Sequence, residues 1–355
     1  MAATSLCRTR EKRMRILVLG GPFLNKGFEA LGCEVFNVGD KRDCGVHHPH
    51  PMSALRLFER ISSRGFTPDL ALYCDSGNMP QFFDLEKLPC PSAFYSIDSY
   101  CNPWHIPFGH AFDTVFVAQK DYVDLFVQSG ISASWLPLFF CSARPHYWQQ
   151  ARDIPVVFVG NLGARNNPDR KLFLETFRRI HPLVITRGDY APLFNRSHIV
   201  LNQTAAGEIN FRCFEALACG AVLLMEECAN GLRDLFTPGE HMLPTYARGD
   251  AVQAASTAQA ALGDPKALAR IAGQGRELVE QKHSDVHRAA EIVRVMQTLL
   301  RDASPLRRLL PENASRQGAL LANAYFFLAA ELGQPRHAPH RDLFLRLARS
   351  LERAA

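Results

Sequence analysis

The stretch GEINFRCFEALACG, residues 207–220, lies between two strand-like apolar runs, HIVLNQ (198–203) and AVLLMEE (221–227). Runs of this kind are typical of buried parallel strands, so the segment between them predicts a short helix that starts at the mouth of a parallel sheet. Asn210 suits its N-cap and Gly220 its end. The first amides of a helix have no intrahelical partner and carry the positive end of the dipole, so this helix start predicts a phosphate site.

Within this helix Phe211, Phe214 and Leu217 share one face, while Arg212 and Glu215, three residues apart, lie on another. The apolar face is expected to pack and the polar face to meet a ligand. An ordinary surface ion pair between Arg212 and Glu215 is the alternative. The apolar flanking strands favour the ligand interpretation.

Strand-like runs alternate with helical stretches along most of the 355 residues. Six runs, RILVLG, EVFNVG, DLALYC, SAFYSI, TVFVAQ and SWLPLF, predict a doubly wound domain over residues 1–140. After a polar linker (141–153), PVVFVGN, LVITRG, HIVLNQ, AVLLMEE and HMLPTY predict a second over residues 154–300. The fold class is therefore α/β, with two Rossmann-like domains facing across a cleft and helices at the C-terminus.

Residues 301–355 are expected to form a helical hairpin broken at GQPRHAPH (333–340). One arm carries the apolar run Tyr325 to Leu328. We expect such a hairpin to cover a core, with contact to a partner protein as the alternative.

Composition excludes several classes of function. A net charge of +5, from 40 basic and 35 acidic residues, is too mild and dispersed for nucleic acid as the main partner. We expect no membrane span and no secretory signal, and ten scattered cysteines without a CxxC pair suggest a reducing cytoplasm. A loop with His47, His48 and His50 could hold a metal, but no carboxylate or cysteine stands at ligand spacing, so a solvated loop is preferred.

Candidate chemistry in the first domain centres on the end of SAFYSI. Asp98 closes this run, and Asp98 and His105 are expected to project toward the cleft, where either could accept a proton from an acceptor hydroxyl. Asp98 could instead cap a turn. Gly21, at the end of the first run, could let the backbone approach a ligand, although a tight turn alone would also explain it.

Candidate donor-binding residues in the second domain follow its strand ends. Gly160, Asn161, Arg165 and Arg170 come at and after the end of PVVFVGN, and Asn202 lies in HIVLNQ. The arginines could hold phosphate oxygens, or either of them could be a solvated loop charge. Because the sequence has no Asp-x-Asp, we expect no metal and no resident cofactor.

The runs FYSIDS, FDTVFVAQKDYVDLF, WLPLFF, IVLNQTAAGEINFRCFEALACGAVLLMEE and LFTPGEHMLPTY resemble the CgeB-like family, named after a spore-maturation protein. This family is a branch of the GT-B glycosyltransferases. The resemblance, over about residues 68–294, implies that the second domain binds a nucleotide-sugar donor. It places Glu215 on the ribose and the helix start near Asn210 at the diphosphate, and gives the acceptor to the first domain.

The chain departs from the related retaining enzymes at one position. Those enzymes carry two glutamates separated by seven residues; the later one matches Glu215, but the earlier position falls on Gly207, and Glu208 is displaced by one. The role of Glu208 and the stereochemical course therefore stay open.

The leading prediction is metal-independent transfer of a sugar from a nucleotide diphosphate to a peptide, glycan or small metabolite. A non-catalytic nucleotide-sugar sensor or scaffold is the alternative. A solute-binding protein would need export, and a dinucleotide oxidoreductase is disfavoured because GGPFLNKG lacks the G-x-G-x-x-G spacing, although Asp40 stands at a suitable distance.

Overall fold

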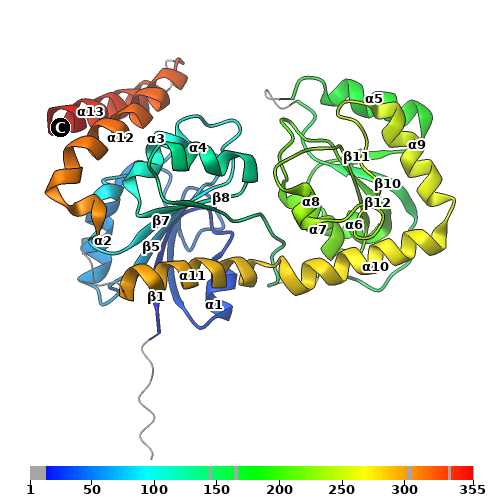
Figure 1. Ribbon diagram of the computed structural model, residues 1–355, viewed down its shortest axis with the longest axis horizontal. Helices are drawn as coiled ribbons and strands as arrows, with labels where there is room; N and C mark the ends of the chain where they lie inside the picture. The colour runs from blue at the N-terminus through cyan, green and yellow to red at the C-terminus, as the bar shows by residue number, and fades with distance from the viewer. Residues whose placement is uncertain (1–12, 144–145, 164–166, 302–305, 335–336, 355) are drawn as a thin grey trace, which may run out of the picture.

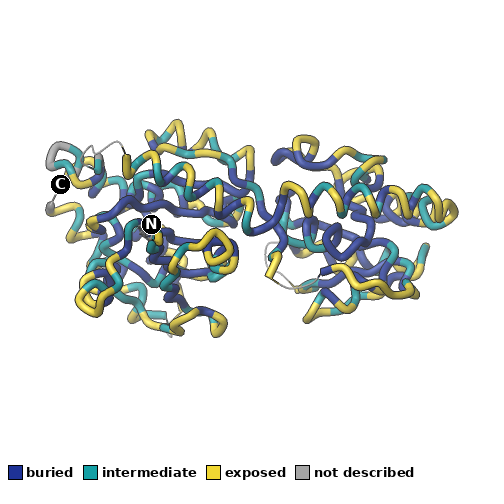
Figure 2. Tube along the Cα trace, turned by 90° about the horizontal axis from the view of Figure 1, so that it is seen from below, coloured by how far each residue is buried: buried dark blue, intermediate teal, exposed yellow. Residues whose placement is uncertain are grey.

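The structure is a computed structural model that describes residues 13–143, 146–163, 167–301, 306–334 and 337–354. The chain folds into two α/β domains, each built on its own parallel sheet, with the last helices lying against the first domain (Figure 1). Figure 2 shows a buried core in each domain and a narrow waist between them.

The N-terminal sheet has seven parallel strands in the order β3-β2-β1-β5-β7-β8-β9. The strands are β1 (Arg15–Gly20), β2 (Glu34–Gly39), β3 (Val46–His47), β5 (Leu70–Cys74), β7 (Ser92–Ser96), β8 (Thr114–Val117) and β9 (Ala133–Trp135). Each of the six predicted runs contributes a strand, although SWLPLF (134–139) is extended only as far as Trp135, and β3 adds a short edge strand. The strand order reverses between β1 and β5, which pair from Ile16 with Leu70 to Gly20 with Cys74.

Helices cover both faces of this sheet because its strands are apolar on both sides. Along β1, Ile16 and Val18 point to the face that α1 (Asn25–Ala30) and α11 (Asp285–Arg301) cover. Leu17 and Leu19 point to the other. That face carries α2 (Ala54–Ser62), α3 (His105–Phe108), α4 (Val123–Gln128), the 3₁₀ turn η2 (Gly109–Ala111) and α12 (Pro311–Glu331). A two-stranded sheet, β4 (Met52–Ser53) with β6 (Phe82–Phe83), and the 3₁₀ turns η1 (Leu85–Lys87), η3 (Lys120–Tyr122) and η4 (Arg307–Leu309) complete the domain.

The second sheet has four parallel strands in the order β11-β10-β12-β13. They are β10 (Ile154–Val159), β11 (Val184–Thr186), β12 (Ser197–Asn202) and β13 (Val222–Met225). The surrounding helices are α5 (Arg170–Ile180), α6 (Ala191–Arg196), α7 (Phe211–Ala218), α8 (Leu232–Leu235), α9 (Ala251–Leu262) and α10 (Pro265–Lys282). The strand order reverses around β10, so its end lies at a topological switch point.

The predicted strand HMLPTY (241–246) does not form. The segment runs beside β13, where Leu243 donates to the Leu223 carbonyl and Tyr246 to the Met225 carbonyl. Pro244 has no amide hydrogen to donate. Between these two hydrogen bonds the segment advances by three residues while β13 advances by two, so the two chains do not keep a regular register. Only isolated bridges remain there, including one between Glu226 and Tyr246.

The C-terminal helices return to the first domain. Helix α10 packs on the second sheet through Leu268 and Ile271, whereas α11 buries Ile292 and Met296 under the first. The hairpin of α12 and α13 (Ala338–Ala354) buries Tyr325 in the same cluster as the N-terminal sheet. The prediction that the hairpin covers a core is confirmed, and Phe327 is the large apolar side chain that it leaves exposed among the described residues.

Candidate functional site

The carboxyl ends of both sheets face the cleft between the domains, and three adjoining cavities lie there. The large cavity, about 480 Å³, is lined mostly by the second domain; it includes Tyr100, Gly160, Asn161, Arg170, Arg187, Tyr190, Glu208, Asn210, Phe211, Arg212 and Glu215. The small cavity, about 140 Å³, adjoins it and includes Phe23, Asp75, Gly77, Asp98, Tyr100, Gln119, Glu208, Asn210 and Phe211. The aromatic cavity, about 360 Å³, includes Phe23, Lys26, Phe139, Tyr190, Phe211 and Glu215.

Helix α7 begins where these cavities meet. Phe214 and Leu217 are buried and hold the helix against the core, as predicted, whereas Phe211, expected on the same packing face, is half-buried and lines all three cavities. Asn210 occupies the N-cap position, but its side chain makes no capping hydrogen bond. It exchanges hydrogen bonds with the Asn202 side chain instead, at 3.2 and 3.3 Å. The helix ends at Ala218, and Gly220, two residues later, has a φ of +69°, the left-handed conformation expected of a helix stop.

Arg212 turns from α7 toward the strand ends. Its Nε and Nη2 donate to the Val159 carbonyl at 3.0 and 2.7 Å, and Nη1 donates to Asn202 Oδ1 at 2.5 Å. The guanidinium also lies 4.8 Å from the centre of the Phe158 ring. These contacts hold a positive charge at the wall of the large cavity, and burial lowers the pKa of Arg212 without discharging it.

Arg170, at the start of α5, is the second cation of this cavity and is 7% exposed. It donates to Gln203 Oε1 at 2.8 Å, to the Gln203 carbonyl at 3.0 Å and to the Asn161 carbonyl at 3.0 Å. Arg170 therefore joins the loops after β10 and β12 and contributes its charge to the space between them. Arg165 lies outside the described residues.

Glu208 is tied to the loop that precedes it. Its carboxylate accepts from the Ala205 amide at 3.0 and 2.9 Å and from the Ala206 amide at 2.8 Å. Thr204 in turn donates its amide to the buried Glu226 at 3.0 Å. Glu208 still borders both the large and the small cavity.

The other donor-binding candidates divide into two groups. Gly160, Asn161 and Glu215 line the large cavity. Asn202 is fully buried and bonds to Arg212 and Asn210, so it positions those side chains from behind.

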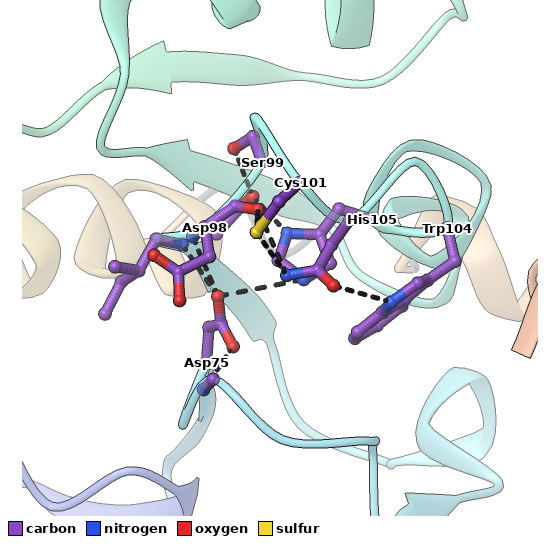
Figure 3. Close-up of polar contacts among 10 residues, drawn as sticks. Asp75, Asp98, Ser99, Cys101, Trp104 and His105 are labelled. Atoms are coloured by element: carbon purple, nitrogen blue, oxygen red, sulfur yellow. Dashed lines mark hydrogen bonds and ion pairs between the residues drawn. The ribbon is translucent and has the colours of Figure 1, made fainter. Parts of the chain in front are cut away.

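On the first domain, Asp98 follows β7 and lines the small cavity, as expected from its place in the sequence. Its backbone amide donates to Asp75 Oδ2 at 2.9 Å, and Asp75 also accepts from the Gly77 amide at 2.8 Å (Figure 3). Burial, the charge of Asp75 and that of Glu208 raise the pKa of Asp98 to about 7, against the opposing charge of Lys41. A carboxyl group with this pKa can gain or lose a proton near neutral pH.

The prediction that His105 projects into the cleft is wrong. His105 opens α3 and is fully buried, packed against Trp104 and Phe94. Its Nδ1 bonds to Ser96 Oγ at 2.8 Å, while Nε2 lies 3.7 Å from Asp75 Oδ2 and has no hydrogen-bond partner (Figure 3). Burial lowers the pKa of His105 to about 4, so the ring is neutral and lies behind Asp75.

Gly21 also differs from expectation, because it is buried behind Phe23. A Cβ at this position would lie 2.6 Å from the Phe23 ring and 3.1 Å from the Asp75 carbonyl oxygen. The glycine thus permits close packing in a strand-to-helix turn, and Phe23 is the side chain that reaches the cavities.

Sequence reasoning missed several residues of the site. Asp75 and Arg187 follow the ends of β5 and β11, and this position at a strand end is the signal that could have identified them. Gln119 closes the run TVFVAQ and carries the same signal. Tyr100 and Tyr190 do not, because their place in the site depends on contacts across the cleft.

Within the described part of the chain, no group of three or more His, Cys, Asp or Glu residues is arranged to hold a metal ion. His47 and His50 are exposed. No helix in the same part of the chain combines the length and apolar character needed to cross a membrane.

Residues 145–294 match the model of the family described as glycosyl transferase-like. The match covers most of the linker, the second domain and the beginning of α11. No curated protein matches the chain by sequence.

Solved structures resemble the chain over both domains. The sucrose-phosphate synthase from Thermosynechococcus elongatus superposes with a TM-score of 0.59 and 14% identity, over 82% of this chain and 100% of that one. HepE from Anabaena, in complex with UDP-glucose, gives 0.56 and 12% over 81% and 100%. A glycosyltransferase from Rickettsia africae gives 0.56 and 9% over 82% and 100%. The predicted GT-B fold is confirmed.

Proposed function

We propose that this protein transfers a sugar from a nucleotide diphosphate sugar to a hydroxyl or similar nucleophile of an acceptor. One observation carries the proposal: the start of α7, with Arg212 beside it, borders a cavity that continues to Asp98 on the opposite domain. The glycosyl transferase-like family match over the second domain supports it. The UDP-glucose bound by the structurally similar HepE supports the class of donor.

The donor would occupy the large cavity, whose volume of about 480 Å³ suits a nucleotide. Its diphosphate would face the first amides of α7 and the guanidinium groups of Arg212 and Arg170. Glu215, one turn further along α7, would accept hydrogen bonds from the ribose, as the CgeB-like resemblance implies. In this arrangement the charge that develops on the departing diphosphate is stabilised by preorganised groups, so we propose that no metal is needed.

Asp98 would act as the general base from the first domain. In its ionised form it would accept the proton of the acceptor nucleophile, while that atom bonds to the anomeric carbon. The bond from this carbon to the phosphate oxygen breaks, and the diphosphate leaves with the electron pair. The acceptor, whether a peptide, a glycan or a small metabolite, would approach along the N-terminal domain.

We place the reaction in the cytoplasm, on the sequence argument that ten scattered cysteines suit a reducing compartment.

One observation favours the alternative, a nucleotide-sugar-binding sensor or scaffold without catalysis. The Glu208 carboxylate accepts three hydrogen bonds from its own loop, which occupy it with backbone amides rather than with a sugar. Hydrolysis of the donor in the absence of an acceptor separates the two proposals: an enzyme releases the nucleotide slowly, whereas a sensor returns the donor unchanged.

A thermal-shift panel of nucleotides and nucleotide sugars tests the proposal directly. A donor at about 100 times its dissociation constant should stabilise the fold by about 2.7 kcal/mol, which is readily visible as a rise in Tm. Nucleoside monophosphates and free sugars serve as controls. If no nucleoside diphosphate or nucleotide sugar raises Tm, the donor assignment is wrong.

A further inference from the structure

We infer that Gln119 is a positioning residue that fixes Glu208 and Asn210 of the second domain against Asp98 of the first. The inference rests on the proposed function, because it assigns Gln119 to the same site. Its structural part can be tested without any substrate.

Gln119 follows β8, and its side chain crosses from the first domain to the second. Its Nε2 donates to the Ile209 carbonyl at 3.1 Å, and its Oε1 accepts from the Ile209 amide at 3.0 Å. One side-chain amide thus satisfies both backbone groups of one residue, as a neighbouring strand would. Gln119 is 1% exposed and Ile209 is 2% exposed, so water does not compete for either bond.

Ile209 stands between two residues that face the site. Glu208 and Asn210 each line both the large and the small cavity, and Gln119 itself lines the small cavity with Asp98. Because the backbone of Ile209 is held from the opposite domain, the spacing between Glu208 and Asp98 is set by the reach of one glutamine. Glutamine suits this role because its amide both donates and accepts.

Other contacts across the same interface do not fix Ile209. Asp121 and Asn230 exchange backbone-to-side-chain hydrogen bonds at 3.3 and 3.1 Å. Lys120 and Asp234 form an exposed ion pair at 2.9 Å. These contacts keep the domains together when Gln119 is changed, and Asn230 Nδ2 still holds the Gly207 carbonyl at 2.9 Å, so the expected effect is a local loosening of residues 208–210.

The charges around Asp98 make this loosening measurable. Burial raises the pKa of Asp98 most, Asp75 from the end of β5 and Glu208 from the loop before α7 raise it further, and Lys41 from the loop after β2 lowers it. If Glu208 moves away, the pKa of Asp98 falls. The acidic limb of the pH–rate profile, over which the transfer rate rises as Asp98 loses its proton, then moves to lower pH. A purely structural change would not cause this shift.

The test compares Gln119→Met, similar in size but without hydrogen bonds, with Lys120→Met as the matched interface control. Hydrogen exchange of the peptide containing residues 205–210 is followed on the free protein. We expect exchange about tenfold faster, or more, in Gln119→Met and no change in Lys120→Met.

The turnover of Gln119→Met should fall by about tenfold to a hundredfold, its donor KM should stay within about threefold of the wild-type value, and the acidic limb of its pH–rate profile should shift to lower pH. In a Glu208→Gln background, Gln119→Met should cause no further shift of that limb.

Unchanged exchange and unchanged turnover in a folded Gln119→Met protein would overturn the inference. If that variant does not fold, Gln119→Glu repeats the hydrogen-exchange part of the test, because a carboxylate keeps the bond from the Ile209 amide and loses the one to its carbonyl; its pH profile is not compared, since the added charge would itself raise the pKa of Asp98. If the wild-type protein shows no sugar transfer while exchange in Gln119→Met is faster, the proposed function fails and the positioning contact stands.

Discussion

The carboxylate of Asp75 lies directly behind Asp98 and accepts a hydrogen bond from the Asp98 backbone amide at 2.9 Å. Asp75 is 2% exposed and also receives the Ile97 amide at 3.3 Å. It therefore holds the turn after β7 in place and also raises the pKa of the neighbouring side chain. The same buried group thus fixes the position of the proposed base and adds to the effect of burial on its pKa.

Asp98→Asn should lower turnover by about a hundredfold to ten-thousandfold, because the amide cannot accept the acceptor's proton. The pKa of Asp98 is raised to about 7, so its ionised form is lost as pH falls through that value. We therefore expect the wild-type rate to rise with pH between about 6 and 8, and the variant to lose this limb. Donor affinity, measured by calorimetry, should stay within about threefold. If Asp98→Asn turns over at the wild-type rate, Asp98 is not the general base.

Asp75→Asn should move the acidic limb to lower pH by up to about one unit, since one negative charge near Asp98 is removed. The amide offers fewer acceptor sites to the amides that Asp75 holds, so the free energy of unfolding should fall by about 1–3 kcal/mol. Asp69→Asn is the control, because its carboxylate accepts the Arg15 amide at the amino ends of β1 and β5, the end of the sheet away from the cleft. A limb that moves equally in both variants would argue against a direct charge effect.

Most strands and the start of α7 could be predicted because each depends on a local pattern. Leu70 to Cys74 and Val222 to Met225 are apolar without interruption, which indicates strands buried on both faces. Asp98 was found because it follows such a run. HMLPTY carries the same signal, but Pro244 prevents a regular ladder.

Residues that act through distant contacts could not be predicted. Gln119 and Ile209 are 90 positions apart, and nothing in either sequence neighbourhood indicates that they meet. His105 has the residue type of a base, but the short helix α3 turns it into the aromatic cluster of the core. For both residues the tertiary packing decides the role.

Glu215→Ala should weaken binding of the best nucleotide from the thermal-shift panel by about tenfold, because a charged hydrogen-bond acceptor is lost. Glu215 is half-buried at the junction of the large and aromatic cavities, so the fold should remain intact. Glu277→Ala, on the exposed face of α10, is the control. Equal affinity of the two variants in calorimetry would exclude Glu215 from the donor site.

Gly160→Ala should displace Arg212 and weaken donor binding by about tenfold. The reason is that two hydrogen bonds from one guanidinium group to a phosphate require that group to keep its orientation. The added Cβ would lie 2.6 Å from Arg212 Nη2 and 3.1 Å from the Phe158 ring on which that guanidinium stacks. Gly163→Ala, in the same loop, has no atom of a described residue within 4 Å of the added Cβ and should bind normally. If both alanine variants bind the donor with normal affinity, Arg212 does not contact the donor phosphate.

Arg308→Met should destabilise the N-terminal domain by about 3–5 kcal/mol, because it leaves a buried carboxylate without its cation. Arg308 lies in the turn before α12 and bonds to Asp113 at 3.1 Å, to the Glu86 and Leu88 carbonyls at 2.7 Å and to the Cys90 carbonyl at 2.6 Å. The side chains of the ion pair are 1% and 7% exposed, so solvent hardly screens it. Arg349→Met, on the exposed face of α13, is the control and should change stability by less than about 0.5 kcal/mol.

The double variant Arg308→Met/Asp113→Leu separates the ion pair from the carbonyl contacts. Removing both charges should recover part of the lost stability, because replacing a buried pair costs less than breaking it. Denaturant unfolding gives the free energies, and limited proteolysis reports whether the hairpin of α12 and α13 detaches first. If Arg308→Met unfolds at the same denaturant concentration as Arg349→Met, the hairpin is held by the apolar contacts of Tyr325 and its neighbours alone.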